Sequence, residues 1–294
     1  MDTSRQLYET DASGWKRGVY GDVQATFRAP IVNWIFRTLM ANEPAFTRYL
    51  WGQVKPLFQT RAFGQYSVRY RDVVLSAIEG DGGNESGLQT YRRADLDLAP
   101  AEFRELRGQA ATFDVVGPRL AALFEVADRS LHGESVGSDP NGDAAATEPL
   151  PDWLDRDRGL SPTMVEPGGV PDDLDETVER IRAFHDLDEG LPSVYRCLAQ
   201  WPAYLRTAWS DLEPALESPA VERAGEATDA FVDSVAYSPR LSPDDLRSRG
   251  IDEETITGLR ELLETFNRGP IETVLPALPV YAATLDAAGR RELA

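Results

Sequence analysis

The chain has 294 residues, of which 42% are hydrophobic, 49 are acidic and 30 are basic, so its formal net charge is −19. This length and apolar content suit one large domain or two moderate ones. We find no clustered basic face of the kind that phosphate binding needs, so nucleic acid is not expected as a partner. A single cysteine, Cys197, excludes an intrachain disulfide, and two histidines argue against a His-rich metal site.

Lysine is almost absent: Lys16 and Lys55 are the only two, and all other basic residues are arginine. A dispersed acidic coat keeps a protein hydrated in concentrated salt, where screening weakens self-repulsion. We therefore expect this protein to come from the cytoplasm of a halophile. The alternative is an acidic protein of a mesophile. The N-terminal residues lack the apolar core of a signal peptide, and no apolar run reaches membrane-spanning length, so no membrane partner is expected.

Apolar residues recur at helical spacing from the start of the chain. Val19, Val23 and Phe27 fall four residues apart and predict a first helix. Further helices are expected, in chain order, over residues 34–39, 45–54, 62–78 and 113–131. The second of these should end at Pro56, because proline removes a backbone donor. Pro100, followed by an acid in the first turn, indicates another helix start.

The C-terminal half shows the same patterns. Leu174, Val178 and Ile181 predict a helix, and Ser242 has the position of an N-terminal cap. The last expected helical stretch covers residues 256–285 and corresponds to the one that ends the first half. No segment alternates apolar and polar residues with a period of two, so we predict an all-α fold.

Between the halves the composition changes to Gly, Ser, Asp, Pro and Ala, which is typical of an exposed connecting segment. We therefore predict a first helical repeat over residues 1–132, an acidic flexible linker over residues 133–170 and a second helical repeat over residues 171–294.

The most informative feature is a sequence motif that occurs twice, as VNWIFRTL over residues 32–39 and LPSVYRCL over residues 191–198. The correspondence continues through a Pro-x-aromatic segment and a tryptophan, Trp51 in one copy and Trp209 in the other. The offset is 159 residues and drops to 158 after one gap. The chain is therefore predicted to contain two copies of one helical unit, and a site between the copies is the first place to expect function.

These paired motifs resemble those of the group I 2-haloacid dehalogenases, the DehI type, over most of the chain outside the linker. The resemblance implies an all-α pseudo-dimer with an alkylhydroperoxidase-D-like helical fold. It also implies hydrolysis of 2-halocarboxylic acids to 2-hydroxy acids of inverted configuration. In that chemistry an aspartate activates a water molecule, without a covalent enzyme ester and without a cofactor.

The family's water-activating aspartate is expected at the start of the motif helix in the second copy, beside the Tyr195–Arg196 pair. That stretch of this chain contains no acid. The nearest carboxylates are Asp186, Asp188 and Glu189, of which we take Asp188 and Asp186 as candidate catalytic residues. The alternative function is a non-catalytic homologue that binds small carboxylates and lacks the aspartate.

The candidate substrate pocket combines residues of both motifs with residues of the last helical stretch: Asn33, Trp34, Phe36, Arg37, Ser193, Tyr195, Arg196, Phe266, Asn267 and Tyr281. Phe113 and Asp114 are weaker candidates. Arg37 and Arg196 could hold a carboxylate through paired hydrogen bonds. Because both copies carry this arginine, a structural ion pair or a carbonyl clamp is the favoured interpretation. Trp34 and Phe36 differ from their counterparts, which is what a single shared site requires.

Several polar residues have both a chemical and a structural interpretation. Asn267 could orient water or cap the helix that ends before Gly269. His185 could act as a base, but a partner for the helix dipole is favoured. Cys197 corresponds to Thr38, which indicates a small buried filler rather than a nucleophile. We expect a small carboxylic acid substrate, no metal, no cofactor and a possible homodimer.

Overall fold

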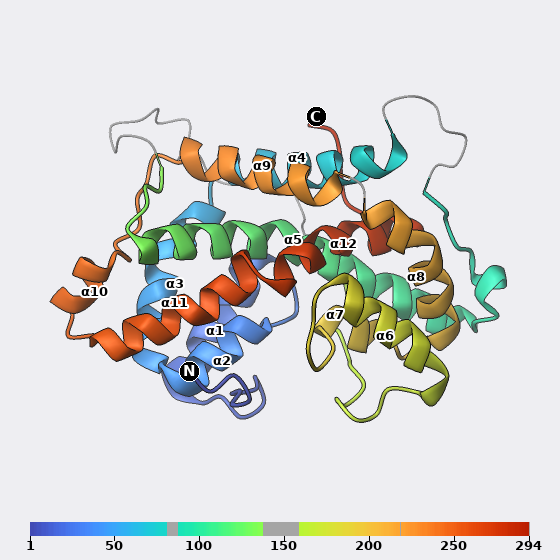
Figure 1. Cartoon of the computed structure of the whole chain (residues 1–294), viewed down its shortest axis with the longest axis horizontal. Coiled ribbons are helices and arrows are strands. Elements are labelled where there is room, and N and C mark those ends of the chain that lie inside the picture. Colours follow the sequence, from blue (N-terminus) through green and yellow to red (C-terminus); the bar gives the residue numbers. More distant parts are fainter. Residues whose placement is uncertain (81–87, 138–158, 218, 294) are drawn as a thin grey trace.

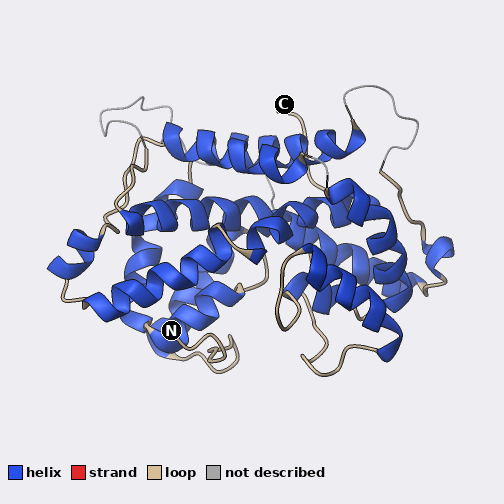
Figure 2. Cartoon of the chain, in the orientation of Figure 1, coloured by secondary structure: helices blue, strands red, loops and turns tan. Residues whose placement is uncertain are grey.

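The computed structural model describes residues 1–80, 88–137, 159–217 and 219–293, and within these ranges the chain is helical and forms no strand (Figure 2). The all-α prediction is confirmed. The helices are α1 (Gly14–Phe27), α2 (Trp34–Asn42), α3 (Pro44–Phe58), α4 (Arg61–Glu79), α5 (Pro100–His132), α6 (Asp175–Phe184), α7 (Ser193–Leu198), α8 (Pro202–Leu216), α9 (Ala220–Ser234), α10 (Pro243–Ser248), α11 (Glu253–Asn267) and α12 (Pro270–Thr284), with short 3-10 turns at Arg93–Leu96 and Asp172–Leu174.

The helix starts follow from local sequence. Helices α3, α5, α8, α10 and α12 each begin with proline, whose missing N–H is of no consequence in the first turn. The predicted start at Pro100 is confirmed, and the Glu102 carboxylate accepts a hydrogen bond from the Ala99 N–H at 2.7 Å. The predicted cap is also confirmed, because the Ser242 hydroxyl accepts from the Asp245 N–H.

The predicted helix bounds differ from the structure at three places. Pro56 does not end α3, which continues to Phe58, where Leu57 and Phe58 are buried. The stretch over 113–131 and the predicted start at Pro100 belong to one 33-residue helix, α5, which runs through Pro118. Burial of the surrounding apolar side chains outweighs the lost hydrogen bond. The stretch over 256–285 divides into α11 and α12 where Gly269 meets Pro270.

The two halves form one packed body (Figure 1). Helices α5 and α12 cross its centre in contact with each other, and α4 and α9 lie side by side along one surface. On one flank, α1 and α2 both contact α3, and on the other α6 and α7 both contact α8. The buried apolar residues form a single cluster that extends through both halves.

The repeated tryptophans pack as predicted. The rings of Trp51 and Phe36 lie edge to face with centroids 5.6 Å apart, and those of Trp209 and Tyr195 do so at 5.8 Å. Both tryptophans are buried, so core packing accounts for their presence in each copy. The pseudo-dimer symmetry of the whole chain stays a prediction.

The predicted linker lies partly outside the described residues, since 138–158 are not among them. Its C-terminal part, from residue 159, is bonded to both halves. The Leu160 N–H donates to the Gly108 carbonyl at 2.8 Å, and the Val165 N–H donates to the Arg196 carbonyl at 3.2 Å. This stretch therefore joins α5 to α7.

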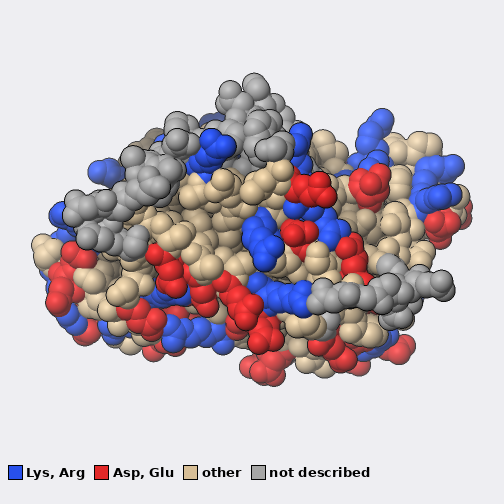
Figure 3. Space-filling view, turned by 90° about the horizontal axis from the view of Figure 1, so that it is seen from above, with Lys and Arg blue, Asp and Glu red and all other residues tan. Residues whose placement is uncertain are grey.

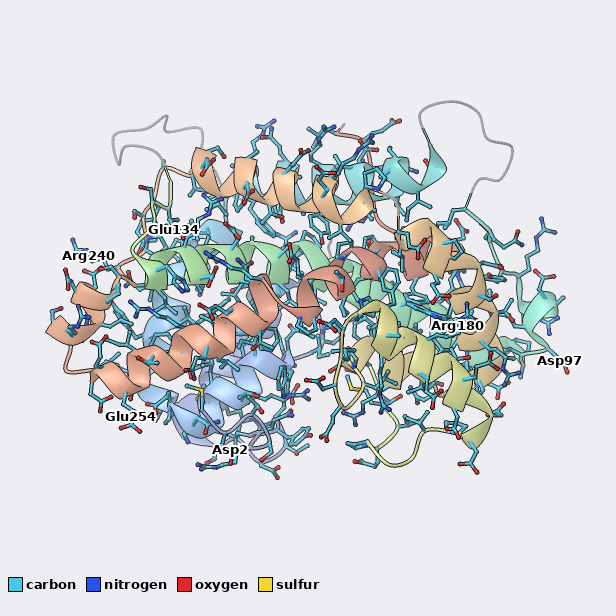
Figure 4. The ribbon with its side chains drawn as sticks, viewed as in Figure 1. Asp2, Asp97, Glu134, Arg180, Arg240 and Glu254 are labelled. Carbon is cyan, nitrogen blue, oxygen red and sulfur yellow. The ribbon has the colours of Figure 1, made fainter. Side chains whose placement is uncertain are left out.

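Charged side chains of both signs lie on the surface of the described residues. Seen from above, acidic and basic groups are mixed over the face of the molecule (Figure 3). Two residues labelled in Figure 4 show the usual pattern of pairing: Glu134 accepts from Arg268, and Arg180 donates to Glu213. None of the described helices is long and apolar enough to span a membrane.

His185 forms a buried link between α6, α7 and α12. Its Nε2 lies 2.5 Å from the Tyr195 hydroxyl and its Nδ1 lies 2.7 Å from the Thr273 hydroxyl. Burial lowers the pKa of the imidazole to about 4, so the ring is neutral at pH 7. A neutral ring does not stabilise the helix dipole by charge, and the favoured interpretation of His185 was therefore wrong.

Acid should destabilise the protein through His185. The unfolded imidazole, with a pKa of 6.5, takes up its proton before the folded one does, so stability is lost as pH falls from about 6.5 towards 4. Between pH 7 and pH 5 this loss should be about 2 kcal/mol. Urea unfolding of the native protein and of His185→Gln measures it, because every carboxylate that titrates in this range is common to both proteins. Parallel pH profiles would contradict this assignment.

Candidate active site

A cavity of about 390 Å³ opens where the two halves meet. Its walls come from α2, α5, α7 with the loop before it, and the junction of α11 with α12. They are mainly apolar, with side chains from Trp34, Ile35, Phe113, Val116, Leu120, Phe124, Leu187, Leu191, Val194, Phe266, Ile271, Val274, Leu275 and Leu278. The volume and the apolar lining are those of a small-molecule site.

Three aromatic rings from three helices form one wall. Phe266 of α11 lies with its ring centroid 4.8 Å from that of Trp34 in α2 and 4.8 Å from that of Phe124 in α5. Trp34 and Phe266 were predicted pocket residues, and both line the cavity. Phe113, the weaker candidate, lines it as well.

A polar corner, which we define as Gln6, Asn33 and Arg37, interrupts the apolar lining. The Arg37 side chain is 8% exposed, its Nε has no hydrogen-bond partner, and it forms no ion pair with any described residue. The Tyr8 ring covers its guanidinium at 4.9 Å. The side-chain oxygens of Asn33 and Gln6 are also buried without partners. A buried cation without a counter-charge is costly, so this corner is suited to an anionic ligand.

The two arginines paired by the repeat have different surroundings. Arg196 also lines the cavity, but its Nε donates to the Val165 carbonyl at 2.9 Å. It is therefore the carbonyl clamp that the repeat favoured. Arg37 has no such partner, so the structural interpretation does not extend to it.

Among the described residues, Glu189 is the carboxylate that lines the cavity. It lies in the loop between α6 and α7, next to Gly190. Asp186 and Asp188, the candidates taken from the sequence, are exposed and lie outside the lining. Asp186 has a left-handed backbone with φ of 53°, which ends the helical direction of α6. Of the three carboxylates that the sequence offered in this loop, Glu189 is therefore the one at the cavity.

Four predicted pocket residues lie outside the lining, namely Phe36, Tyr195, Asn267 and Tyr281. Tyr195 is buried behind the wall, although its neighbours Val194 and Arg196 both line the cavity. At 3.6 residues per turn, Val194 and Arg196 can both face the cavity only if Tyr195, which lies between them in the sequence, points to the opposite side of α7. Tyr281 lies further back, 5.8 Å from the Tyr195 ring, and Phe36 belongs to the Trp51 cluster. Ser193 lines the cavity as predicted.

Asn267 and Asp114 have structural roles elsewhere. Asn267 neither caps α11 nor faces the cavity, because its Nδ2 donates to Glu125 at 2.8 Å and to Asp128 at 3.0 Å and so joins α11 to α5. Asp114 is fully buried and accepts from Arg71 at 2.7 Å. Buried charges are commonly paired in this way, which accounts for Asp114 without a role in binding.

Cys197 is the buried filler that the sequence predicted. Its thiol donates to the Gln109 side chain at 3.0 Å, and burial raises its pKa to about 12. The thiol therefore stays protonated and is a poor nucleophile. Within the described ranges, no group of three or more His, Cys, Asp or Glu side chains could hold a metal ion.

Gln6 was missed entirely. It precedes α1 and has no counterpart in the repeat, so the duplicated motif gave no reason to select it. It is placed beside α2 because the Leu7 N–H donates to the Arg37 carbonyl at 3.1 Å. The α12 side of the cavity was also missed, because that helix is apolar around most of its circumference and has no distinctive motif.

Comparison with known proteins agrees with this geometry. The family model described as halocarboxylic acid dehydrogenase DehI matches residues 30–166. An (R)-2-haloacid dehalogenase of Pseudomonas putida is 26% identical over 259 residues, which are 84% of this chain and 82% of that protein. A configuration-inverting 2-haloacid dehalogenase of Pseudomonas sp. strain 113 is 25% identical over 275 residues, 90% and 85% of the two chains.

Solved structures share the fold. The complex of a D-2-haloacid dehalogenase with L-LA has a TM-score of 0.79 at 21% identity and covers 97% of this chain and 96% of its own. The complex of a mutant D-2-haloacid dehalogenase with D-2-CPA has a TM-score of 0.78 at 22% identity, with 95% of each chain covered. The family model over residues 30–166, relatives that extend over most of the chain and a common fold make this chain similar to the DehI-type 2-haloacid dehalogenases.

Proposed function

We propose that this protein hydrolyses 2-halocarboxylic acids to 2-hydroxy acids. The observation that carries the proposal is the buried Arg37, whose Nε lacks a partner at the edge of a mainly apolar cavity. A carboxylate would supply the missing counter-charge and a planar pair of acceptors. The activities of the relatives fit an acid of this kind.

The polar corner would orient the substrate. With its carboxylate on Arg37, the adjoining α-carbon and halogen lie against the aromatic wall. The edges of aromatic rings carry partial positive charge, which suits a departing halide. The amides of Asn33 and Gln6 add donors and acceptors whose orientation adapts to the ligand.

Glu189 would act as the general base. Its carboxylate takes a proton from a water molecule as the water oxygen forms a bond to the α-carbon. The carbon–halogen bond breaks on the opposite side, and the halide leaves with the bonding electron pair. Attack from the side opposite to the leaving group inverts the configuration at the α-carbon. Positioning of the water and of the acid contributes most of the catalysis in such a displacement.

Assembly and habitat are proposals as well. The homodimer stays a prediction, and so does the halophilic cytoplasm inferred from the net charge of −19. The molar mass in solution at high and low salt tests both.

Glu189→Gln should reduce halide release roughly 100- to 10,000-fold, because it removes the base and keeps the shape of the side chain. The measurement is bromide release from 2-bromopropionate in concentrated salt. Asp186→Asn and Asp188→Asn are matched controls from the same loop, and both should stay near the native rate. Loss of activity in Asp188→Asn, with retention in Glu189→Gln, would assign the base to Asp188 instead.

The non-catalytic alternative gives a different result in the same assay. A protein that binds 2-bromopropionate and releases no bromide would be the carboxylate-binding homologue without a base. In that case Val194→Asp, which places an acid in the cavity wall at the start of α7, should gain activity.

Arg37→Met should raise KM roughly 10- to 100-fold with a smaller change in kcat, because hydrogen bonds to a charged group are lost while the volume of the side chain is kept. Arg206→Met is the control, since Arg206 is exposed and pairs with Asp173. Equal KM values for the native protein and Arg37→Met would show that the carboxylate binds elsewhere.

A further inference from the structure

We propose that the natural substrate carries a long apolar group on its α-carbon. This group is an alkyl chain of roughly six or more carbons or an aryl group, as the dimensions of the cavity require. This inference rests on the proposed function, because that function fixes the carboxylate at Arg37. It adds the identity of the group that fills the rest of the cavity.

The cavity is too large for a three-carbon acid. 2-Chloropropionate has six non-hydrogen atoms, and a water molecule takes up about 30 Å³ in the liquid. Even at that generous allowance for each atom, the acid fills less than half of the 390 Å³. The remaining volume would hold water against apolar walls, or would be empty, and both are unfavourable.

The shape of the cavity fits an extended group. On α5 the lining residues Phe113, Val116, Leu120 and Phe124 form one continuous stripe at helical spacing. A helix rises 1.5 Å per residue, so this stripe is about 16 Å long. The carbon chain of propionate spans under about 4 Å, whereas a ten-carbon chain at about 1.3 Å per bond approaches the length of the stripe.

The adjoining wall is also apolar. Ile271, Val274 and Leu278 of α12 line the cavity next to the α5 stripe, since the two helices pack together. Trp34 and Phe266 add flat ring surface that would suit an aryl group. The buried polar atoms without a partner belong to Gln6, Asn33 and Arg37, so the anionic end of the ligand lies there and its apolar group lies along the apolar walls.

The expected effect grows with chain length. Burying one methylene group improves binding about fourfold, so hexanoate should bind roughly 50 times more tightly than propionate. The gain should continue until the chain reaches the end of the stripe and should then stop.

Two parallel series test the inference. Calorimetry of propionate, butyrate, hexanoate, octanoate and decanoate measures how the cavity is filled without any need for catalysis. Bromide release from 2-bromopropionate, 2-bromohexanoate, 2-bromooctanoate and 2-bromo-3-phenylpropionate measures kcat/KM. We expect affinity and kcat/KM to rise together from the three-carbon acid to the six- and eight-carbon acids.

The outcomes separate this inference from the proposed function. Hydrolysis of 2-bromopropionate with no gain for longer acids would overturn the inference and leave the function standing. Rising affinity of the halogen-free acids, with no bromide released from any 2-bromo acid, would support the long apolar ligand and overturn the function. Falling affinity along the halogen-free series would overturn the inference directly.

A widened cavity provides an internal control. Leu120→Ala removes side-chain volume from the middle of the α5 stripe and should move the optimum to longer or bulkier acids. Leu131→Ala makes the same change on the same helix at a buried position outside the lining. It should lower stability and leave the optimum chain length where it is. An identical optimum in Leu120→Ala and the native protein would place the apolar group outside this cavity.

Discussion

The packing of α5 against α12 is the constraint on which the rest of the structure depends. Helix α5 is 33 residues long and is buried along most of its length, and α12 is apolar around nearly all of its surface. Neither could be stable exposed to water, so each covers the other and the remaining helices surround the pair. The cavity lies beside this contact, and both of its long walls belong to these two helices. The site is therefore built on the most deeply buried elements of the fold, which keeps its geometry fixed.

The paired motifs of the two halves share their packing and differ in their polar contacts. Phe36 in the first half and Tyr195 in the second pack against equivalent tryptophans, but only Tyr195 has a hydroxyl, which contacts His185. Arg196 is satisfied by a carbonyl, and Arg37 is left without one. In each pair, only the residue of the second half has the hydrogen bond described here. A cavity shared by two similar halves needs such differences, because a single ligand can occupy it in only one orientation.

Helix positions and the tryptophan clusters could be predicted because they depend on local spacing and on burial, which one sequence records directly. Pro56 misled the predicted end of α3, where tertiary packing outweighs a lost hydrogen bond. The choice among Asp186, Asp188 and Glu189 depends on the backbone path of one loop, and a left-handed residue there was not visible in the composition. Gln6 could not be predicted because its neighbour in the cavity, Arg37, is distant from it in the sequence. Only the folded chain brings the two together, through the hydrogen bond from the Leu7 N–H to the Arg37 carbonyl.

Salt should weaken the repulsion between the acidic surface and an anionic substrate while leaving the contact with the buried Arg37 largely intact. A chain with a net charge of −19 repels an anionic acid at a distance in dilute solution. At molar salt the screening length falls to about 3 Å, which removes that repulsion and would equally remove attraction from an exposed arginine. A buried guanidinium such as Arg37 is screened much less, so it keeps its hold on a carboxylate under the conditions that the acidic surface suits. Salts that are excluded from protein surfaces also strengthen apolar burial. A ligand with one anionic end and a long apolar body is thus the kind that this cavity would retain best in concentrated salt.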